Sequence, residues 1–264
     1  MKKLYLLFLL SLPLLAEGQS KVRASLAIWP EWQVDYRLGE EGLLFFRNQY
    51  RMNTDSRYNG LRPSGLLGNF ERIELSLGYE HAFSEHWRGG ALVRYAAENY
   101  PKATFYALFL RHQGHISSLY FNKQFLFDYV RQEEQDPYGR FRLMAELGKR
   151  LPLKNKFITP VLSFEMMLLS EFGQEGGQRQ EERAIDRTRL RLGVNYELTD
   201  KLRLNPYVMG QTNYYYVLIA PVYDEAGQLL EEGYTTKRNR LMPVVGVEVK
   251  YSIHQAPTTA GITY

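Results

Sequence analysis

The sequence predicts an all-β protein, a single closed antiparallel barrel whose strands cross a membrane. Three observations predict this fold class. Apolar and polar residues alternate with period two over long segments, no apolar segment is long enough for a spanning helix, and short connections alternate with long ones. Aromatic residues make up 14% of the 264 residues and hydrophobic residues only 45%, which is typical of β-structure with membrane interfaces.

The N-terminus has the features of a secretory signal peptide. Two lysines precede an apolar run at 4–16, and the residues up to Gly18 give the small-x-small pattern that a signal peptidase cleaves. The run covers 13 residues, fewer than the roughly 20 that a spanning helix needs. We therefore expect residues 1–18 to be a signal peptide and residues 19–264 to form one barrel domain.

Period-two alternation gives the expected strands. In the first of them Leu26, Trp32 and Val34 share one face, while Glu31 and Asp35 share the other. Most such segments exceed ten residues, whereas strands of soluble proteins run about 5–6 and a tilted strand that crosses a bilayer needs about 9–11. Length therefore favours a membrane barrel with its apolar face toward lipid and its charged face toward the lumen. The expected strands lie near 23–38, 43–53, 70–83, 87–99, 103–112, 116–130, 140–151, 157–171, 185–198, 202–219 and 238–253.

Connections between these segments are either tight or long. The long, polar ones fall at 53–69, 131–139, 173–183 and 221–237, and barrels place such loops outside and short turns in the periplasm. The segments number eleven, but an even number is expected when both termini lie in the periplasm. We therefore predict about twelve strands, with ten as the alternative, and expect a separate hairpin within 214–236. Bulges or strand ends are expected at four prolines, which cannot donate to a ladder: Pro30, Pro160, Pro206 and Pro243.

The order of these hairpins resembles a family of outer-membrane barrels of Bacteroidota-type bacteria for which no function is known. The resembling segments are the Trp-led hairpin Trp29–Arg51, the hairpin Glu74–Tyr95 and the late hairpin Arg187–Val208. They are generic barrel hairpins, and the chain departs from the family at 221–237 and 255–264. The resemblance implies a barrel in the outer membrane, and it implies no catalytic residue and no substrate.

Charged residues dominate the face that alternation turns toward the lumen. Buried charges are tolerable only when they are paired, so this face predicts either a closed network of arginine–carboxylate pairs or a narrow aqueous pore. The run Arg187, Arg189 and Arg191 has one sign and would favour an anion. The predicted lumen-facing charges are Arg72, Glu74, Glu80, Arg88, Arg94, Arg142, Glu146, Arg150, Glu165, Arg187, Arg189, Arg191, Glu197, Arg203, Glu248 and Lys250.

Other kinds of chemistry find little support in the sequence. There is no cysteine, which excludes disulfides, thiolate metal sites and lipid attachment to an N-terminal cysteine, and a net charge of +4 from 33 basic and 29 acidic residues does not indicate a nucleic-acid surface. His112 and His115, near Ser117 and Ser118, form the most enzyme-like cluster, but they sit at an expected turn without a third member. We expect no metal and no cofactor.

The sequence therefore predicts an outer-membrane barrel without enzymatic activity, exported by its signal peptide. The first functional hypothesis is a structural or surface-interaction barrel with a charge-paired interior. The alternatives are a passive channel for small solutes, anions included, and a lipid hydrolase on the barrel wall. The expected partners are outer-membrane lipid, periplasmic chaperones and the barrel-insertion machinery, and no nucleic acid.

Overall fold

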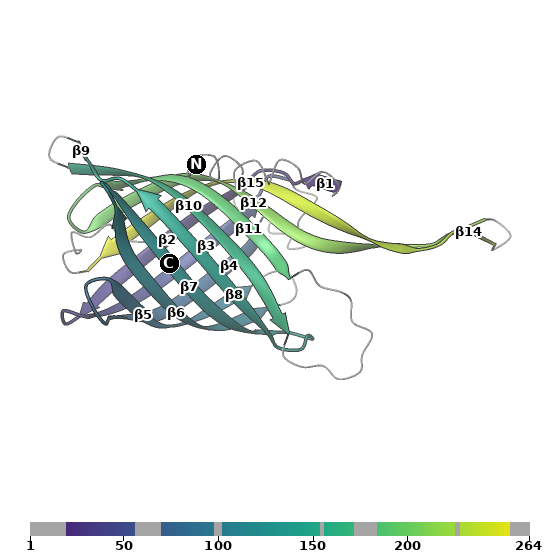
Figure 1. The fold of residues 1–264 in the computed structure, drawn as a ribbon, viewed down its shortest axis with the longest axis horizontal. Coiled ribbons are helices and arrows are strands. Elements are labelled where there is room, and N and C mark those ends of the chain that lie inside the picture. The colour runs from purple at the N-terminus through teal and green to yellow at the C-terminus, as the bar shows by residue number, and fades with distance from the viewer. Residues whose placement is uncertain are drawn as a thin grey trace, which may run out of the picture.

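The structure, a computed structural model, describes residues 20–55, 70–97, 102–153, 156–171, 184–224 and 228–253. The expected signal peptide, the expected loop at 173–183, most of the loop at 53–69 and the tail lie outside these residues. In the described part of the chain, eleven long strands close into a barrel (Figure 1). These strands are β2 (Ala27–Leu38), β3 (Gly42–Asn53), β4 (Phe70–Ala82), β5 (Trp87–Ala97), β6 (Ala103–Ile116), β7 (Leu119–Gln132), β8 (Tyr138–Gly148), β10 (Lys156–Glu171), β11 (Ile185–Glu197), β12 (Leu202–Ile219) and β15 (Tyr234–Ser252).

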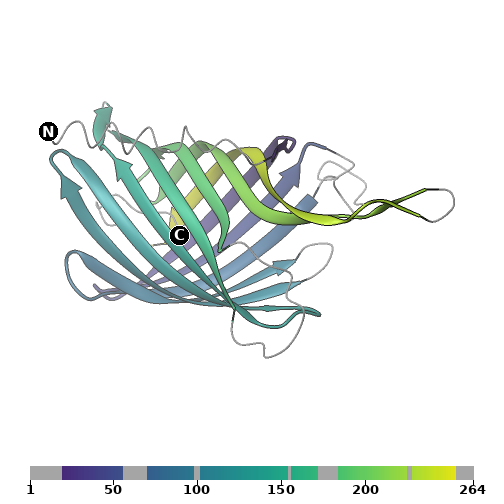
Figure 2. The same cartoon turned by 45° about the vertical axis from the view of Figure 1, so that its right-hand side comes forward.

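The barrel closes through a parallel pair of strands. Successive barrel strands pair antiparallel in chain order, but β15 joins β2 in parallel, from Val244 opposite Ala27 to Ser252 opposite Asp35. The prediction of about twelve strands, with ten as the alternative, is thereby corrected to eleven. The expectation of an even number assumed an antiparallel closing pair, and a parallel pair requires an odd number instead. The strand ends that are joined by tight turns gather at one end of the barrel, the short-turn end, and those joined by longer connections gather at the other, the long-loop end (Figure 2).

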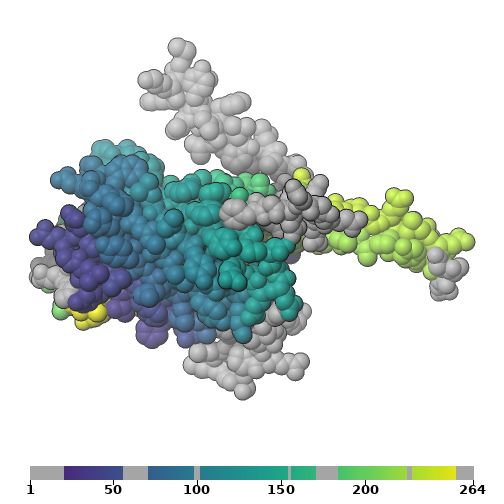
Figure 3. Space-filling view, turned by 90° about the horizontal axis from the view of Figure 1, so that it is seen from below, coloured from purple at the N-terminus to yellow at the C-terminus, as the bar shows by residue number. Residues whose placement is uncertain are grey.

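The stretch expected to hold an additional hairpin does hold one, but this hairpin adds no strand to the barrel and lies beyond two lengthened barrel strands. β12 pairs with β11 as far as Asn213, but its pairing with β15 continues to Ile219 opposite Tyr234. The two strands therefore leave the barrel as a two-stranded ribbon, which projects beyond the long-loop end (Figures 1 and 3). Its tip is a small separate hairpin of β13 (Val222–Tyr223) and β14 (Leu229–Glu231). None of the described residues forms a helix long and apolar enough to cross a membrane.

Two further short strands complete the sheet. β1 (Ser20–Arg23) lies parallel to β15, and β9 (Leu151–Leu153) pairs with β10 in the register of β8. β8 and β9 flank the position opposite Pro160, where the ladder is interrupted because proline has no N–H to donate. The ladder with a neighbouring strand is likewise interrupted at Pro30 and Pro206, but in each case it resumes in the same register. The prediction of a strand end is therefore met at Pro160, and no bulge forms at these three prolines.

Apolar side chains cover the outside of the barrel. On β2 the Trp32 side chain is 61% exposed, whereas its neighbour Glu31 on the inner face is 5% exposed. The same alternation recurs on β4, where Leu77 is exposed and Glu74 is buried. A soluble β-protein would show the reverse arrangement, because water would favour the charged face. The arrangement therefore fits a barrel whose outer surface contacts lipid.

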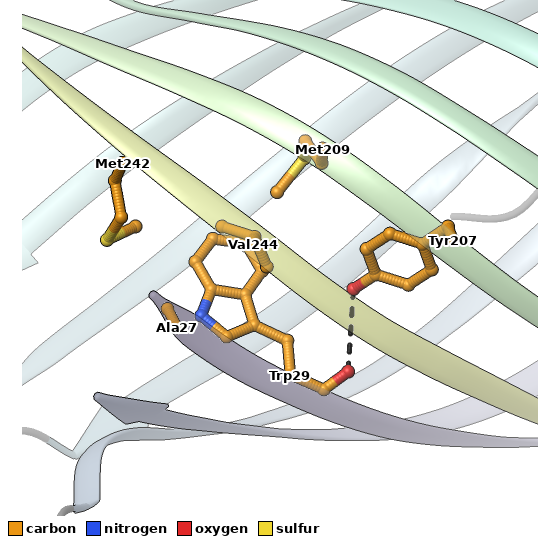
Figure 4. Close-up of a cluster of buried hydrophobic side chains, with 6 residues drawn as sticks. All are labelled: Ala27, Trp29, Tyr207, Met209, Met242 and Val244. Carbon is orange, nitrogen blue, oxygen red and sulfur yellow. Dashed lines mark hydrogen bonds between the residues drawn. The ribbon is translucent and has the colours of Figure 1, made fainter. Parts of the chain in front are cut away.

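The interior also contains apolar side chains. Trp29, Tyr207 and Met209 pack together on the inner face near the closing pair, and the Tyr207 hydroxyl donates to the Trp29 carbonyl oxygen at 3.5 Å (Figure 4). Two other clusters lie on the inner side of β3 and of β5 to β7, one around Phe45 and Phe109 and one around Phe105. Large inward side chains narrow the lumen, so the inside of the barrel is partly filled.

Glycines on neighbouring strands make room for the inward aromatic rings. Phe45 lies directly opposite Gly78, and Tyr207 lies opposite Gly246. A Cβ atom at Gly78 would come 2.3 Å from the Phe45 ring, and one at Gly246 would come 2.2 Å from the Tyr207 ring. These rings lie flat across the neighbouring strand because no side chain stands there.

Candidate functional site

The candidate site is the charged inner face of the barrel. Each barrel strand turns alternate residues inward, so charges spaced by two residues along one strand stand one above another. Of the sixteen charges predicted for this face, five are buried: Glu74, Glu80, Arg94, Glu146 and Glu248. The others are partly buried, namely Arg72, Arg88, Arg142, Arg150, Glu165, Arg187, Arg189, Arg191, Glu197, Arg203 and Lys250.

Glu74 on β4 is the centre of the largest group of ion pairs. Its carboxylate lies 3.3 Å from the Arg72 guanidinium, 3.4 Å from Arg51, 3.5 Å from Arg94 and 3.8 Å from Arg47. These four arginines come from β3, β4 and β5, which are neighbouring strands. One negative charge therefore holds several positive ones, and the group as a whole is cationic.

Asp128 on β7 and Glu165 on β10 extend this network around the barrel. Two N–H groups of Arg140 donate to one oxygen of Asp128 at 3.1 and 2.8 Å, and Arg94 pairs with the other oxygen. Arg142 donates to Glu165 through two N–H groups, and Arg189 pairs with the second Glu165 oxygen at 2.9 Å. Charge-assisted bonds of this kind fix the planes of the guanidinium groups.

Charges closer to the short-turn end are more evenly matched. Glu80 lies 2.9 Å from the Arg111 guanidinium and 3.4 Å from that of Arg88. In the same half of the barrel, the Lys250 ammonium lies 2.9 Å from Asp35. Arg150, just after the end of β8, lies 3.1 Å from Glu197 on β11. This half of the lumen therefore consists largely of paired charges of opposite sign.

Several of the lumen arginines lie over aromatic rings. The Arg51 guanidinium lies 4.4 Å from the centre of the Trp29 ring, and that of Arg189 lies 5.4 Å from it. Arg191 lies 3.7 Å from the Tyr207 ring. A cation over an aromatic face is attracted by the quadrupole of the ring, so these contacts hold guanidinium groups beside the lumen where carboxylates are few.

A cavity inside the barrel brings these groups together. It has about 1120 Å³ of empty space, including the part that is open to solvent. Among the described residues, nine arginines line it against three glutamates, Glu31, Glu74 and Glu165. Apolar side chains, Leu92 and Met144 among them, complete its wall. The arginines are Arg47, Arg51, Arg72, Arg94, Arg140, Arg142, Arg187, Arg189 and Arg191.

Comparison with known protein families shows to which family the chain belongs. The profile of a family described as "Protein of unknown function (DUF2490)" matches residues 26–216. The chain belongs to this family. The match covers the barrel strands from β2 to most of β12.

Two solved structures are similar to this DUF2490 chain in the course of the backbone. The first is described as "NanC porin structure in rhombohedral crystal form", with a TM-score of 0.42, 10% identity, and coverage of 83% of this chain and 90% of that one. The second is LpxR from Salmonella typhimurium, with a TM-score of 0.41, 10% identity, and coverage of 78% and 84%. The comparison with curated proteins gave no match.

Sequence reasoning missed several charged residues of the DUF2490 lumen. The most important are Arg47 and Arg51 on β3, Arg111 on β6, and Asp128 and Arg140 on β7 and β8. The signal was present on β3, where Arg47, Gln49 and Arg51 share one face and the other face is apolar apart from Asn48. It was weak on β6, because Phe105, Ala107 and Phe109 also point inward and make both faces apolar.

The histidine and serine cluster does not assemble into a nucleophile–base pair. His112 lies on the outer face of β6, where its ring contacts Trp87 at 4.7 Å and His86 at 6.1 Å between centroids. Ser117 adopts a positive φ of 55° in the β6–β7 turn. Within the described residues, no hydrogen bond joins His112 to Ser117, and no group of three His, Cys, Asp or Glu side chains could hold a metal ion.

Proposed function

We propose that this chain is a bacterial outer-membrane barrel that admits small anionic solutes into its lumen and lets them pass. The observation that carries this proposal is the cavity lining of nine arginines against three glutamates. Even with Asp128, Asp186 and Glu248, which pair with lining arginines, positive charges outnumber negative ones. Rings of arginine favour anions in pores, because they lower the electrostatic energy of an anion that has lost its hydration water.

The outer-membrane location is supported by the outer face and by strand length. Leu77, Leu108 and Trp32 are each more than 60% exposed, and in water such a surface would drive aggregation. The barrel strands run from 11 to 19 residues, enough for the roughly 9–11 that a tilted crossing needs. On this proposal residues 1–18 direct export, periplasmic chaperones and the insertion machinery assemble the barrel, and the short-turn end faces the periplasm.

A closed structural barrel is the second candidate. It is favoured by the matched pairs near the short-turn end, where Glu80, Arg111 and Arg88 form one group and Lys250 and Asp35 another. A lumen closed there would bind anions from the long-loop end without conducting them. The two candidates therefore differ in passage through the barrel.

Swelling of proteoliposomes tests the proposal. The purified protein is placed in liposomes, which are then diluted into isosmotic solutions of small organic acid salts or of uncharged sugars of similar mass. Anion passage predicts faster swelling in the acid salts than in the sugars, and Arg187→Gln should slow it. Arg131→Gln, an exposed position on β7, is the matched control. Swelling at the rate of protein-free liposomes in every solution would favour the closed barrel.

A further inference from the structure

Five of the cavity arginines lie close to the long-loop ends of their strands. Arg51 stands near the end of β3, while Arg72, Arg140 and Arg187 stand near the beginnings of β4, β8 and β11, and Arg189 is one inward position further along β11. Three strands separate β4 from β8, and three separate β11 from β3 around the barrel. These five residues, called here the arginine cluster, therefore reach into the lumen from different walls.

The positive charges of the arginine cluster act on one another across the lumen. Arg51 is repelled by Arg72, Arg189 and Arg187. Arg187 is in turn repelled by Arg140 and Arg72. All five side chains line the same cavity, so their guanidinium groups converge on a common space from separate walls. Such convergence is costly in a partly buried site unless negative charge offsets it.

Carboxylates near the arginine cluster orient it but do not neutralise it. Glu74 is shared by Arg51 and Arg72 with two further arginines, and Glu165 is shared by Arg189 with Arg142. Arg140 shares Asp128 in the same way with Arg94. Because each of these acids is shared with a further arginine, the positive charge of the cluster exceeds the negative charge beside it.

Arg187 shows this surplus most clearly. Its nearest carboxylate oxygen, on the adjacent residue Asp186, is 3.9 Å from Nε, which is too far for a hydrogen bond. The Nε atom is nevertheless buried, and in the described structure it has no hydrogen-bond partner. A buried donor of a charged group without an acceptor is unfavourable, so an acceptor from outside the chain would stabilise it.

We propose that the arginine cluster binds a compact dianion, phosphate or a phosphate monoester, and this rests on the proposed admission of anions into the lumen. A planar carboxylate is satisfied by one or two guanidinium forks, whereas a phosphoryl group presents several oxygens in different directions. Arginines that converge from several walls can each contact a different oxygen of a phosphoryl group. The cavity is large enough to hold the rest of a small phosphorylated molecule.

Trp29 provides a reporter inside this site. Its ring lines the cavity and lies within 5.4 Å of the guanidinium groups of Arg51 and Arg189. The chain has three tryptophans, and the other two, Trp32 and Trp87, are 61% and 43% exposed on the outer face. Replacing both by phenylalanine leaves Trp29 as the only fluorescent indole without changing the lumen.

The test is a fluorescence titration of full-length protein in detergent, in the background Trp32→Phe with Trp87→Phe. Inorganic phosphate is added at constant ionic strength against sodium chloride. The inference predicts a saturable change in Trp29 emission with phosphate and none with chloride. Arg187→Gln should weaken the apparent affinity about tenfold, because it removes one charge-assisted contact. Arg131→Gln, outside the lumen, should leave it unchanged.

Three results would overturn the inference. They are no saturable change with phosphate, the same titration with chloride, or equal affinity for the wild-type cluster and Arg187→Gln. A parallel titration with mixed micelles that contain phosphatidic acid identifies the source of the phosphoryl group. A response to inorganic phosphate alone supports a soluble ligand, and tighter binding of phosphatidic acid supports a lipid headgroup.

The same preparation separates this inference from the proposed function. Saturable phosphate binding without proteoliposome swelling in the acid salts would support the arginine cluster as a binding site and contradict the proposed passage of anions through the barrel. Proteoliposome swelling in the acid salts without phosphate binding would support the passage of anions and contradict the proposed phosphate site.

Discussion

Individual charged residues decide the stability of this barrel's interior. Glu74 lies 4% exposed among four arginines, and Asp128 is fully buried between Arg94 and Arg140. Removing one partner of a buried ion pair costs more than the pair contributes, because the remaining charge loses its compensation. The inner carboxylates therefore act as fixed centres that determine where the arginines stand.

Glu74→Gln should destabilise the folded barrel by about 3–5 kcal/mol, because four guanidinium groups lose their common counter-charge. Glu197→Gln is the matched control, since this partly exposed carboxylate pairs with Arg150 near the short-turn end, and its loss should cost roughly 0.2–1 kcal/mol. Urea unfolding in detergent micelles measures both differences. Equal costs for the two variants would show that burial of the pair does not set its contribution.

Many of the charged residues of the interior could be predicted from the period-two alternation, and others could not, for different reasons. Period two placed Arg72, Glu74 and Glu165 on one face, because their strands alternate cleanly. It could not identify Arg111 or Asp128, because inward Phe109 and Leu126 beside them make the inner face apolar. The convergence of arginines from separate walls depends on how strands far apart in sequence are placed around the barrel, which a single sequence does not contain.

At the scale of elements, close contact between strands depends on glycines. Gly90 on β5 lies opposite Phe109 of β6, and a Cβ atom there would stand 1.9 Å from the Tyr79 carbonyl oxygen. Gly210 on β12 has no atom within 4 Å of the same position. Strand ends were predicted to within four residues throughout, and the range 202–219 without error. The sequence did not show that residues 214–219 and 234–237 leave the barrel as a ribbon, because that depends on where the pairing of β12 with β11 ends.

Gly90→Ala should destabilise the barrel by about 1–3 kcal/mol, because β4 and β5 must move apart to admit the methyl group. Gly210→Ala, on the open face of β12, should change stability by less than about 0.5 kcal/mol. The fraction of heat-modifiable protein on gels, followed against urea concentration, reports both effects. A neutral Gly90→Ala would mean that the two strands are not in the close contact described.

The β12–β15 ribbon should be dispensable for the barrel. Pairing of β12 with β11 ends at Asn213, and that of β15 with β2 begins at Val244. Replacing residues 216–237 by Asn-Gly, which connects the paired Tyr215 and Arg238 through a two-residue turn, should preserve heat-modifiable mobility. Loss of the compact band on unboiled gels would show that the ribbon takes part in closing the barrel.

The whole molecule combines an apolar exterior, a parallel closing pair and a lumen with an excess of positive charge. The parallel closing pair explains why the barrel has an odd number of strands. Eleven segments are recognisable in the sequence, so the correct number would have followed from it without the assumption of an even count. Inward aromatic rings and large side chains narrow the lumen. In so narrow a space the sign of the fixed charge governs which ions enter.

The reversal potential of the barrel in a planar bilayer tests the central claim most directly. With a tenfold potassium chloride gradient across the bilayer, a lumen lined by excess arginine should give a reversal potential with the sign of the chloride equilibrium potential. Arg187→Gln should move that potential toward zero, and Arg131→Gln should not. A reversal potential with the sign of potassium, or the absence of current steps from correctly folded protein, would contradict an anion-conducting lumen.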